Sequence, residues 1–388
     1  MSDEFLVLCS RLNRTERERA LLRGLLDDAP DWPRIIRRAA EDGVIPLVYR
    51  ALKEFGDLIP REVLDELRPY YYRGTARYLR LRNSLGAVVR ELSGRGFRCA
   101  FTKGIRLAES VYVDFALRPF ADIDLLVHPR DGAGIEAALG ELGFKLDAAE
   151  EGGLAAKEKQ LVLRTYSPYY RKDDLLLEIH YDALGLQIPL AFGKDLWAGV
   201  HDIEIGGSRI PVLASEHELC HLCLHVMQHS YCRLIWLTDI AEFVSRPGLD
   251  WDKVHAVCRR EGIRTPVYYG LFLADRLWPG AVAPDVLSGL KPGFLQGILL
   301  KLFWPEDKVR SRRLPLFFPF FMPTFFALIG RKDAGLFIRT IFRILFPPRA
   351  WVAHYYAIKP GSLRIVGHYI WRIQRPFVLI ARRLLYLG

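Results

Sequence analysis

Hydrophobic residues recur along this chain with two different periods, and the change of period divides it into segments. Residues 1–93 show helical spacing, and a long helix is predicted from Arg61 to about Leu92, where two glycines follow. From residue 97 onward, short apolar runs bounded by turn residues predict strands instead. From Ser215 the spacing is helical again.

The predicted strands alternate with short helices. Strands are expected at 97–102, 122–127, 160–165 and 175–180, then as a hairpin over 202–212. Helices are expected at 105–113 and 129–142. We therefore predict an α+β fold with four segments, namely an N-terminal helical segment at 1–93, an α+β core at 94–212, a helical domain at 213–305 and a basic, aromatic-rich tail at 306–388.

The apolar run from Ala121 to Val127 contains two acids, Asp122 and Asp124. Side chains of a strand alternate between its faces, so both carboxylates are predicted to point to the same face. Two neighbouring like charges are costly to bury unless a cation neutralises them. Because Mg2+ prefers oxygen ligands and commonly binds through carboxylates and substrate phosphates, the motif predicts a metal-dependent phosphate site.

A lysine and a glycine precede this motif at positions suited to phosphate binding. Lys103-Gly104 opens a predicted helix, where a glycine lets backbone N–H groups approach a phosphate and the helix N-terminus favours negative charge. Lys103 and Arg118 can neutralise a triphosphate. These three residues are the predicted nucleotide-binding set.

A third carboxylate follows on a later predicted strand. Glu178 would complete the metal site with Asp122 and Asp124 and assist deprotonation of an acceptor, since two metal ions can hold the attacking and leaving oxygens of a displacement. His180 shares the strand face of Glu178, because the two are two residues apart. It is a candidate to contact the substrate or to support the carboxylates, and packing alone is an equal alternative.

The order Lys-Gly, then Arg-Pro, then Asp-Ile-Asp-Leu-Leu-Val resembles the uncharacterised nucleotidyltransferases of the polymerase-beta-like superfamily. The likeness extends to the segments 177–180, 224–229 and 233–240. It implies a small mixed sheet with helices packed on one side. It also implies transfer of a nucleoside monophosphate from an NTP, usually ATP, with Mg2+ and release of pyrophosphate.

The resemblance assigns roles residue by residue. It puts Asp122, Asp124 and Glu178 on the metal carboxylates and Gly104 on the phosphate-loop glycine. The wider superfamily usually has Gly-Ser at this loop, closer to the acidic pair, whereas here Ile105 follows the glycine. That departure leaves open a substrate other than an ordinary NTP.

Histidines recur every four residues at 217, 221, 225 and 229. A helix advances about 400° in four residues, so the row drifts and four imidazoles cannot meet at one metal ion. Packing and hydrogen bonds are expected for most of them, because a structural zinc site needs four converging ligands. His225, His229 and Asp239 remain candidates to contact the acceptor or the nucleotide.

Two other functions are compatible with these residues. An Asp-x-Asp motif also occurs in glycosyltransferases that hold Mn2+ and a nucleotide sugar, but these need a donor-binding half upstream, where this chain is predicted to be helical. A non-catalytic protein that binds a partner or a membrane on a degenerate fold is the second alternative. The acceptor, the base of the NTP and the oligomeric state do not follow from the sequence.

The excess of basic over acidic residues lies in the tail. The net charge is +10, and residues 331–388 contain 11 Lys and Arg against one acid, so residues 1–330 are balanced. A basic apolar tail can cap the fold or bind a membrane surface or an acidic partner, whereas nucleic acid is a less favoured partner. The uncharged run at 314–330 is short for a span and contains three prolines, which predicts a buried or interfacial segment.

The N-terminus has no secretory pattern, and the six cysteines lack a disulfide spacing. Both observations predict a cytoplasmic protein, with peripheral contact at the inner membrane face as an extension of the tail hypothesis.

Overall fold

The protein is described here from a computed structural model. The described residues are 2–28, 30–112, 114–146, 168–181 and 193–304, together with single residues and short runs between 306 and 374. The predicted strand at 160–165 and most of the segment 314–330 lie outside them.

The chain forms two compact units. The first comprises Met1–Lys145 and Tyr170–Arg331, and the second comprises Leu146–Tyr169 and Lys332–Gly388. The first unit contains the N-terminal helices, most of the sheet and the helices that follow it. These two units do not test the four segments predicted from the sequence, so that division stays a prediction.

The N-terminal part of the first unit is helical, as predicted. Its helices are α1 (Ser2–Cys9), α2 (Glu16–Asp27), α3 (Trp32–Asp42), α4 (Ile45–Lys53), the short 3-10 turn η1 (Gly56–Leu58) and α5 (Arg61–Gly94). Thr15 and Glu18 form a capping box that begins α2. Asp31 caps α3, and Gly43 ends it with a φ of 71°, a conformation that glycine adopts without steric cost.

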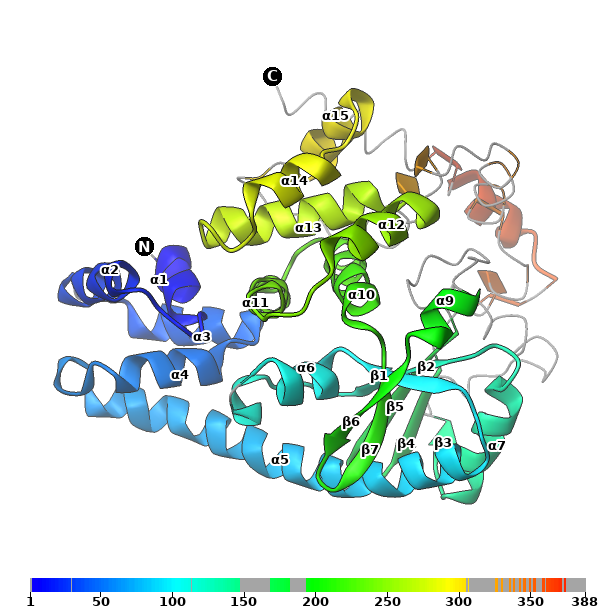
Figure 1. The fold of residues 1–388 in the computed structure, drawn as a ribbon, viewed down its shortest axis with the longest axis horizontal. Helices are drawn as coiled ribbons and strands as arrows, with labels where there is room; N and C mark the ends of the chain where they lie inside the picture. Colours follow the sequence, from blue (N-terminus) through cyan, green and yellow to red (C-terminus); the bar gives the residue numbers. More distant parts are fainter. Residues whose placement is uncertain are drawn as a thin grey trace. The chain divides into compact units, whose positions relative to one another are not determined.

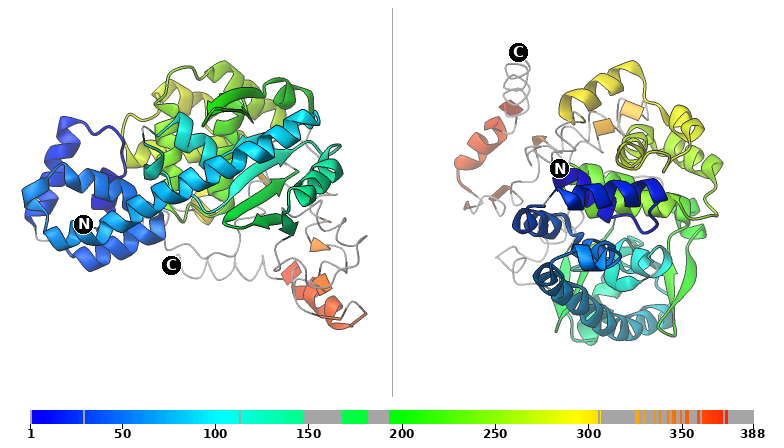
Figure 2. Two further views of the ribbon diagram at one scale, coloured as in Figure 1. Left: turned by 90° about the horizontal axis from the view of Figure 1, so that it is seen from below. Right: turned by 90° about the vertical axis from the view of Figure 1, so that its left-hand side faces the viewer.

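The predicted long helix is present as α5 (Figure 1). It contains 34 residues and buries one apolar stripe, which includes Leu67, Leu81, Leu85 and Leu92. Figure 2 shows the helix running from the N-terminal helices to the sheet. It therefore joins the two parts of the first unit through one continuous element.

The sheet is mixed and has seven strands. They are β1 (Cys99–Thr102), β2 (Ile123–Val127), β3 (Lys145–Leu146), β4 (Tyr169–Lys172), β5 (Leu175–His180), β6 (His201–Ile205) and β7 (Ser208–Val212). The order is β3-β4-β5-β2-β1-β7-β6. β1 is antiparallel to β2, whereas β2–β5 and β1–β7 are parallel. The predicted hairpin is β6–β7, which turns at Gly206-Gly207 with positive φ at both glycines.

The two central strands are buried on both faces. Every residue of β1 and β2 is buried, so both sides of these strands are covered. On β5, by contrast, fully buried residues alternate with half-buried ones, and Glu178 and His180 belong to the half-buried set. That face of β5 is therefore the accessible one.

Helices also connect and follow the strands. Those between the strands are α6 (Gly104–Ser110), the 3-10 turn η2 (Phe115–Leu117), α7 (Gly132–Glu141) and α9 (Gly193–Ala198). Those after the sheet are α10 (Ser215–Gln228), α11 (Leu234–Val244), α12 (Trp251–Glu261), α13 (Arg264–Leu277), α14 (Pro284–Leu290) and α15 (Phe294–Phe303). The start predicted at Ser215 is confirmed.

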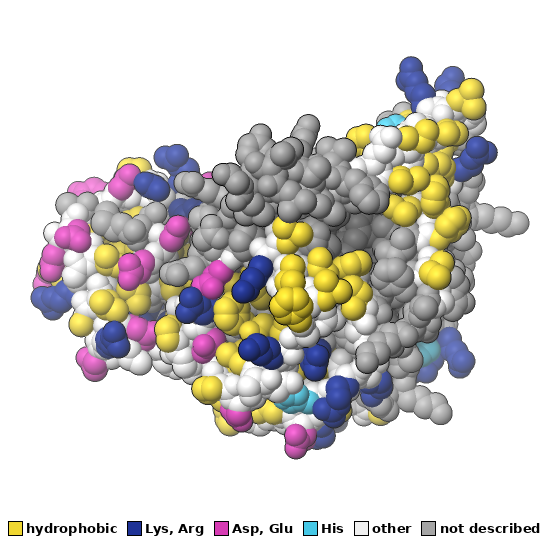
Figure 3. All heavy atoms as spheres, turned by 90° about the horizontal axis from the view of Figure 1, so that it is seen from above, with side chains coloured by type: hydrophobic (Ala, Val, Ile, Leu, Met, Phe, Trp, Pro, Cys, Tyr) yellow, Lys and Arg dark blue, Asp and Glu magenta, His cyan; other side chains and the backbone are white. Residues whose placement is uncertain are grey.

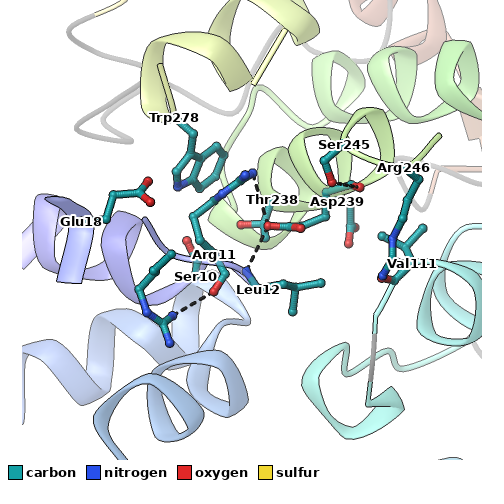
Figure 4. A network of polar contacts seen from close by, with 12 residues as sticks. Ser10, Arg11, Leu12, Glu18, Val111, Thr238, Asp239, Ser245, Arg246 and Trp278 are labelled. Atoms are coloured by element: carbon teal, nitrogen blue, oxygen red, sulfur yellow. Dashed lines mark hydrogen bonds and ion pairs between the residues drawn. The ribbon is translucent and has the colours of Figure 1, made fainter. Parts of the chain in front are cut away.

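Helix α11 ties the N-terminal helices to the rest of the first unit (Figure 4). The buried carboxylate of Glu242 accepts a hydrogen bond from the Leu12 N–H at 3.0 Å and lies 3.3 Å from the Arg11 guanidinium. Two residues past the end of α11, the Arg246 guanidinium donates to the Val111 carbonyl at the end of α6. The helix thus contacts both neighbours through charge-assisted hydrogen bonds, which are stronger than neutral ones.

The second unit has a small apolar cluster of its own. Val352, Ala353 and Ile365 are buried against one another, and Tyr369 packs on them. Among the described residues, no helix combines the length and apolar character needed to cross a bilayer.

Replacing Glu242 tests the link between α11 and the N-terminal helices. Glu242→Ala leaves the Leu12 N–H without its acceptor, so we expect the free energy of unfolding to fall by about 1–3 kcal/mol in urea titrations. Glu16→Ala, which removes an exposed acid on α2, is the matched control and should change stability by less than about 0.5 kcal/mol. Equal stability of the two variants would show that this contact does not hold the N-terminal helices.

Candidate active site

Two carboxylates meet where β2 and β5 run side by side. In this parallel pair Asp124 lies opposite Glu178 in register. His180 follows on the same face of β5, and its Nε2 lies 2.8 Å from Asp124 Oδ1 and 3.5 Å from Glu178 Oε2. One potential ligand atom of each of these three residues lies within 4.8 Å of the others. The pairing of the strands thus brings together residues that are far apart in sequence, and the alternation of side chains places Glu178 and His180 on the same face.

Lys103 reaches the same point from the end of β1. Thr102 pairs with Asp124 across the antiparallel β1–β2 ladder, so the next residue emerges beside this carboxylate. The buried Lys103 ammonium forms a hydrogen-bonded ion pair with Asp124. Its backbone has a φ of 50°, which is uncommon for a residue with a side chain and is stable only where neighbours enforce it.

Each charge in this cluster is stabilised by the opposite charges around it. Burial alone would raise the pKa of Asp124, but Lys103 and His180 outweigh it and hold that pKa well below its usual range. Burial and Lys103 would lower the pKa of His180, yet Glu178 and Asp124 raise it to about 9. At neutral pH the cluster therefore contains an ionised Asp124 and a protonated His180.

Asp122 lies at the edge of this cluster. It immediately precedes β2 and is half-buried. Burial, followed by the negative charges of Asp124 and Glu178, raises its pKa to about 6. Its response to both carboxylates means that the three predicted acids share one electrostatic environment.

The structure places Arg118 in an internal ion pair. Its Nε and Nη2 contact both carboxylate oxygens of Asp239 at 2.7 to 3.0 Å, and Nη1 donates to the Pro119 carbonyl at 2.7 Å. The Tyr112 hydroxyl also donates to Asp239 at 2.7 Å. Arg118 and Asp239, which the sequence suggested as separate ligand contacts, are thus joined to each other, and binding of phosphate by Arg118 would require this pair to open.

Gly104 has a packing requirement of its own. A Cβ at this position would lie 2.8 Å from the Cβ and Cγ of Phe120, closer than real side chains approach. The glycine therefore allows α6 to lie against the segment that leads into β2.

His225 of α10 and His229, directly after that helix, form an aromatic group with Trp236 of α11. The two imidazole centroids are 4.6 Å apart, and each lies 5.0 Å from the indole. Burial, then the positive charge of Lys103, lowers the pKa of His229 to about 4 and that of His225 well below its usual value. Both are therefore neutral at pH 7.

Glu218 was not among the predicted site residues. This buried residue of α10 accepts the Lys103 backbone N–H at 2.8 Å, and its other oxygen lies 3.9 Å from Arg106. It therefore holds the strained turn that presents Lys103 to Asp124. An acid in the first turn of a helix is also expected as a partner of the helix dipole, so the sequence contained no signal that distinguishes this role.

Taken together, the site offers oxygen donors from three acids, an imidazole and a lysine ammonium, which come from the ends of β1 and β5 and from β2 and the residue before it. Such a set can bind a divalent cation together with a polyanion, because carboxylates hold the cation and lysine pairs with phosphate.

Comparison with known proteins agrees with this chemistry. A family model described as "Uncharacterised nucleotidyltransferase" matches residues 28–279, more than half of the chain. No curated protein matches the chain.

The charge on His180 predicts a pH dependence of stability. A histidine with a pKa near 6.5 when unfolded and about 9 when folded contributes stability that is full below pH 6.5 and is lost as the pH rises through 9. In the presence of a chelator, the free energy of unfolding should fall by at most about 1.4 kcal/mol per pH unit in this window. His180→Gln should flatten this slope, and an unchanged slope in the variant would contradict the assignment.

Glu218 can be tested by a pair of substitutions. Glu218→Ala removes the acceptor of the Lys103 N–H, and we expect it to lower the free energy of unfolding by about 1–3 kcal/mol. Glu218→Gln keeps a carbonyl oxygen at that point and should retain most of the stability in the same urea titration. If both variants lose the same amount, the negative charge near Arg106 matters and the hydrogen bond to Lys103 does not.

Proposed function

This chain belongs to the family of uncharacterised nucleotidyltransferases, and from that membership we propose that it transfers a nucleoside monophosphate from an NTP, with ATP as the expected donor. The acceptor is a hydroxyl or phosphate group of a small molecule or a peptide. The proposal is carried by one observation, the meeting of Asp124 and Glu178 in register on parallel strands, with Lys103 beside them.

The donor set fits a hard divalent cation. Asp124 and Glu178 present carboxylate oxygens within 4.8 Å of each other, and Asp122 lies within their electrostatic influence. These three residues would hold Mg2+, or Mn2+, both of which prefer oxygen ligands. When bound, such an ion neutralises phosphate charge and acts as a Lewis acid. His180, through its hydrogen bond to Asp124, would orient that ligand.

The protein's own groups have defined tasks in such a transfer. An acceptor oxygen would form a bond to the α-phosphorus while the bond to the bridging β-phosphate oxygen breaks and pyrophosphate leaves. Burial acts to raise the pKa of Glu178, but His180 and Lys103 outweigh it, so this carboxylate is ionised and can take the proton of a hydroxyl acceptor. The Lys103 ammonium, freed from Asp124, would pair with the leaving phosphates.

The aromatic group on α10 and α11 is our candidate for the wall that contacts the acceptor or the base. His225 and His229 are neutral and half-buried, and Trp236 is likewise half-buried. Neutral rings of this kind stack on planar groups without adding charge to the site.

The glycosyltransferase alternative receives less support. It predicts a donor-binding half with strands upstream of the Asp-x-Asp motif, and the described residues before β1 form helices only. The non-catalytic alternative differs from our proposal in what the protein binds, so a binding experiment separates them.

We also propose a cytoplasmic location. All six cysteines are free, among them the buried Cys9, Cys99 and Cys258, which supports a reducing compartment.

Thermal unfolding with ligands tests the proposed function. NTP and Mg2+ together should raise Tm by several degrees, more than either alone, because a ligand that binds only the folded state stabilises it. Asp122→Asn, at a half-buried acid, should abolish the joint effect and lower NMP transfer by at least about 100-fold. Asp57→Asn, an exposed acid outside the site, is the matched control and should behave like the unaltered protein.

Two outcomes would contradict the proposal. Stabilisation by a nucleoside diphosphate sugar with Mn2+, and not by any NTP, would favour the glycosyltransferase. No joint effect of nucleotide and metal would favour the non-catalytic protein.

A further inference from the structure

The second unit exposes a row of apolar side chains on a short helix at residues 364–371 and directly beside its two ends. Leu363, Val366, Ile370 and Ile373 are 86, 43, 50 and 36% exposed. They are spaced by three, four and three residues, so on a helix they fall within about 80° of one another. They form one continuous stripe.

The same helix has a second apolar side, which packs inside the second unit. Ile365 is buried against Val352 and Ala353, with Tyr369 packed on the cluster. Folding of the unit therefore accounts for the inner side of the helix but not for the exposed stripe. Among the described residues, the stripe remains open to solvent.

A second exposed row lies next to the first. Ile338, Phe342 and Phe346 recur every four residues and are 67, 60 and 37% exposed. The ring centroids of Phe342 and Phe346 are 4.8 Å apart, and Phe346 lies 5.8 Å from Tyr369 of the first helix. The two rows, which we call the tail patch, therefore form one surface. Exposed apolar surfaces of this kind mark interaction sites.

The segment that carries the tail patch is rich in positive charge. The described cations Arg349, Lys359 and Arg364 are exposed, and residues 331–388 contain 11 Lys and Arg with a single acid. Figure 3 shows apolar side chains gathered beside Lys and Arg on this part of the molecule. Trp371, whose ring type is enriched at membrane interfaces, is 43% exposed next to the stripe.

We propose that the tail patch binds the surface of an anionic lipid bilayer. The aliphatic and aromatic side chains would enter the boundary between headgroups and acyl chains, and the lysines and arginines would pair with lipid phosphates. Binding to such a surface needs both kinds of group, because apolar side chains enter the bilayer and basic ones are attracted to anionic lipids.

Other occupants match the patch less well. A second copy of the chain would bring two strongly basic segments together, at a cost in repulsion. Nucleic acid would pair with the cations, but its phosphate backbone has no apolar surface against which the aliphatic stripe could be buried. The proposal does not depend on the nucleotidyltransferase site, since it involves other residues and another ligand.

Vesicle sedimentation with the full chain tests the inference. The protein should sediment with phosphatidylcholine vesicles that contain phosphatidylserine, should not sediment with phosphatidylcholine alone, and should be released by salt. Val366→Glu/Ile370→Glu and, separately, Lys359→Glu/Arg364→Glu should each weaken binding by about tenfold or more. Leu21→Glu/Leu58→Glu, at exposed apolar positions of the first unit, should bind like the unaltered protein.

The stabilisation of each variant by NTP and Mg2+ reports separately on the first unit and should be unchanged. Absence of binding to anionic vesicles, or equal binding to both kinds of vesicle, would overturn the inference. So would a dimer in light scattering without lipid that Val366→Glu/Ile370→Glu dissociates, because the patch would then bind a second copy of the chain.

Discussion

Neutralisation of the buried Asp124 carboxylate is the constraint on which the arrangement of the site depends. An ion of this kind is costly to bury, by several kcal/mol, unless partners with good geometry compensate it. Its two cations come from separate strands, Lys103 from the end of β1 and His180 from the end of β5. Glu218 of α10 then fixes the backbone of Lys103. One charge thus links three strands of the sheet to the helical region.

Helix α11 provides the second set of internal charges. Asp239 and Glu242, three residues apart, are both buried and engage different parts of the chain. Asp239 binds Arg118 on the segment that leads into β2, and Glu242 binds the backbone at Leu12. Because breaking a buried pair leaves an uncompensated charge, these contacts restrict how far the N-terminal helices and the strands of the candidate site can move independently.

The elements were predictable where the hydrophobic period was clear. The α5 helix, the Asp122–Val127 strand and the Gly206-Gly207 hairpin follow from spacing and turn residues alone. The two-sided covering of β1 and β2 did not, because it depends on which helices fold back onto the sheet. A strand bearing Asp124 has the same sequence pattern whether one face or both are covered.

The candidate site was predictable only in part. Alternation along a strand is sufficient to put Glu178 and His180 on one face. The pairing of Arg118 with Asp239 was not foreseeable, because 121 residues separate them and each alone resembles a ligand contact. Glu218 was not predicted because its role depends on another distant contact, the hydrogen bond from the Lys103 backbone N–H, which is 115 residues away in sequence.

The parallel register of β2 and β5 has a consequence for how this chain can vary. Asp124 and Glu178 face each other only while both strands keep their alignment, and a shift by one residue would turn one carboxylate to the opposite face. A single-residue insertion within either strand is therefore intolerable for the site. The connection between the strands contains α7, β3 and β4 but neither of the two acids, so a change of length at one of its turns can leave the register of the pair intact.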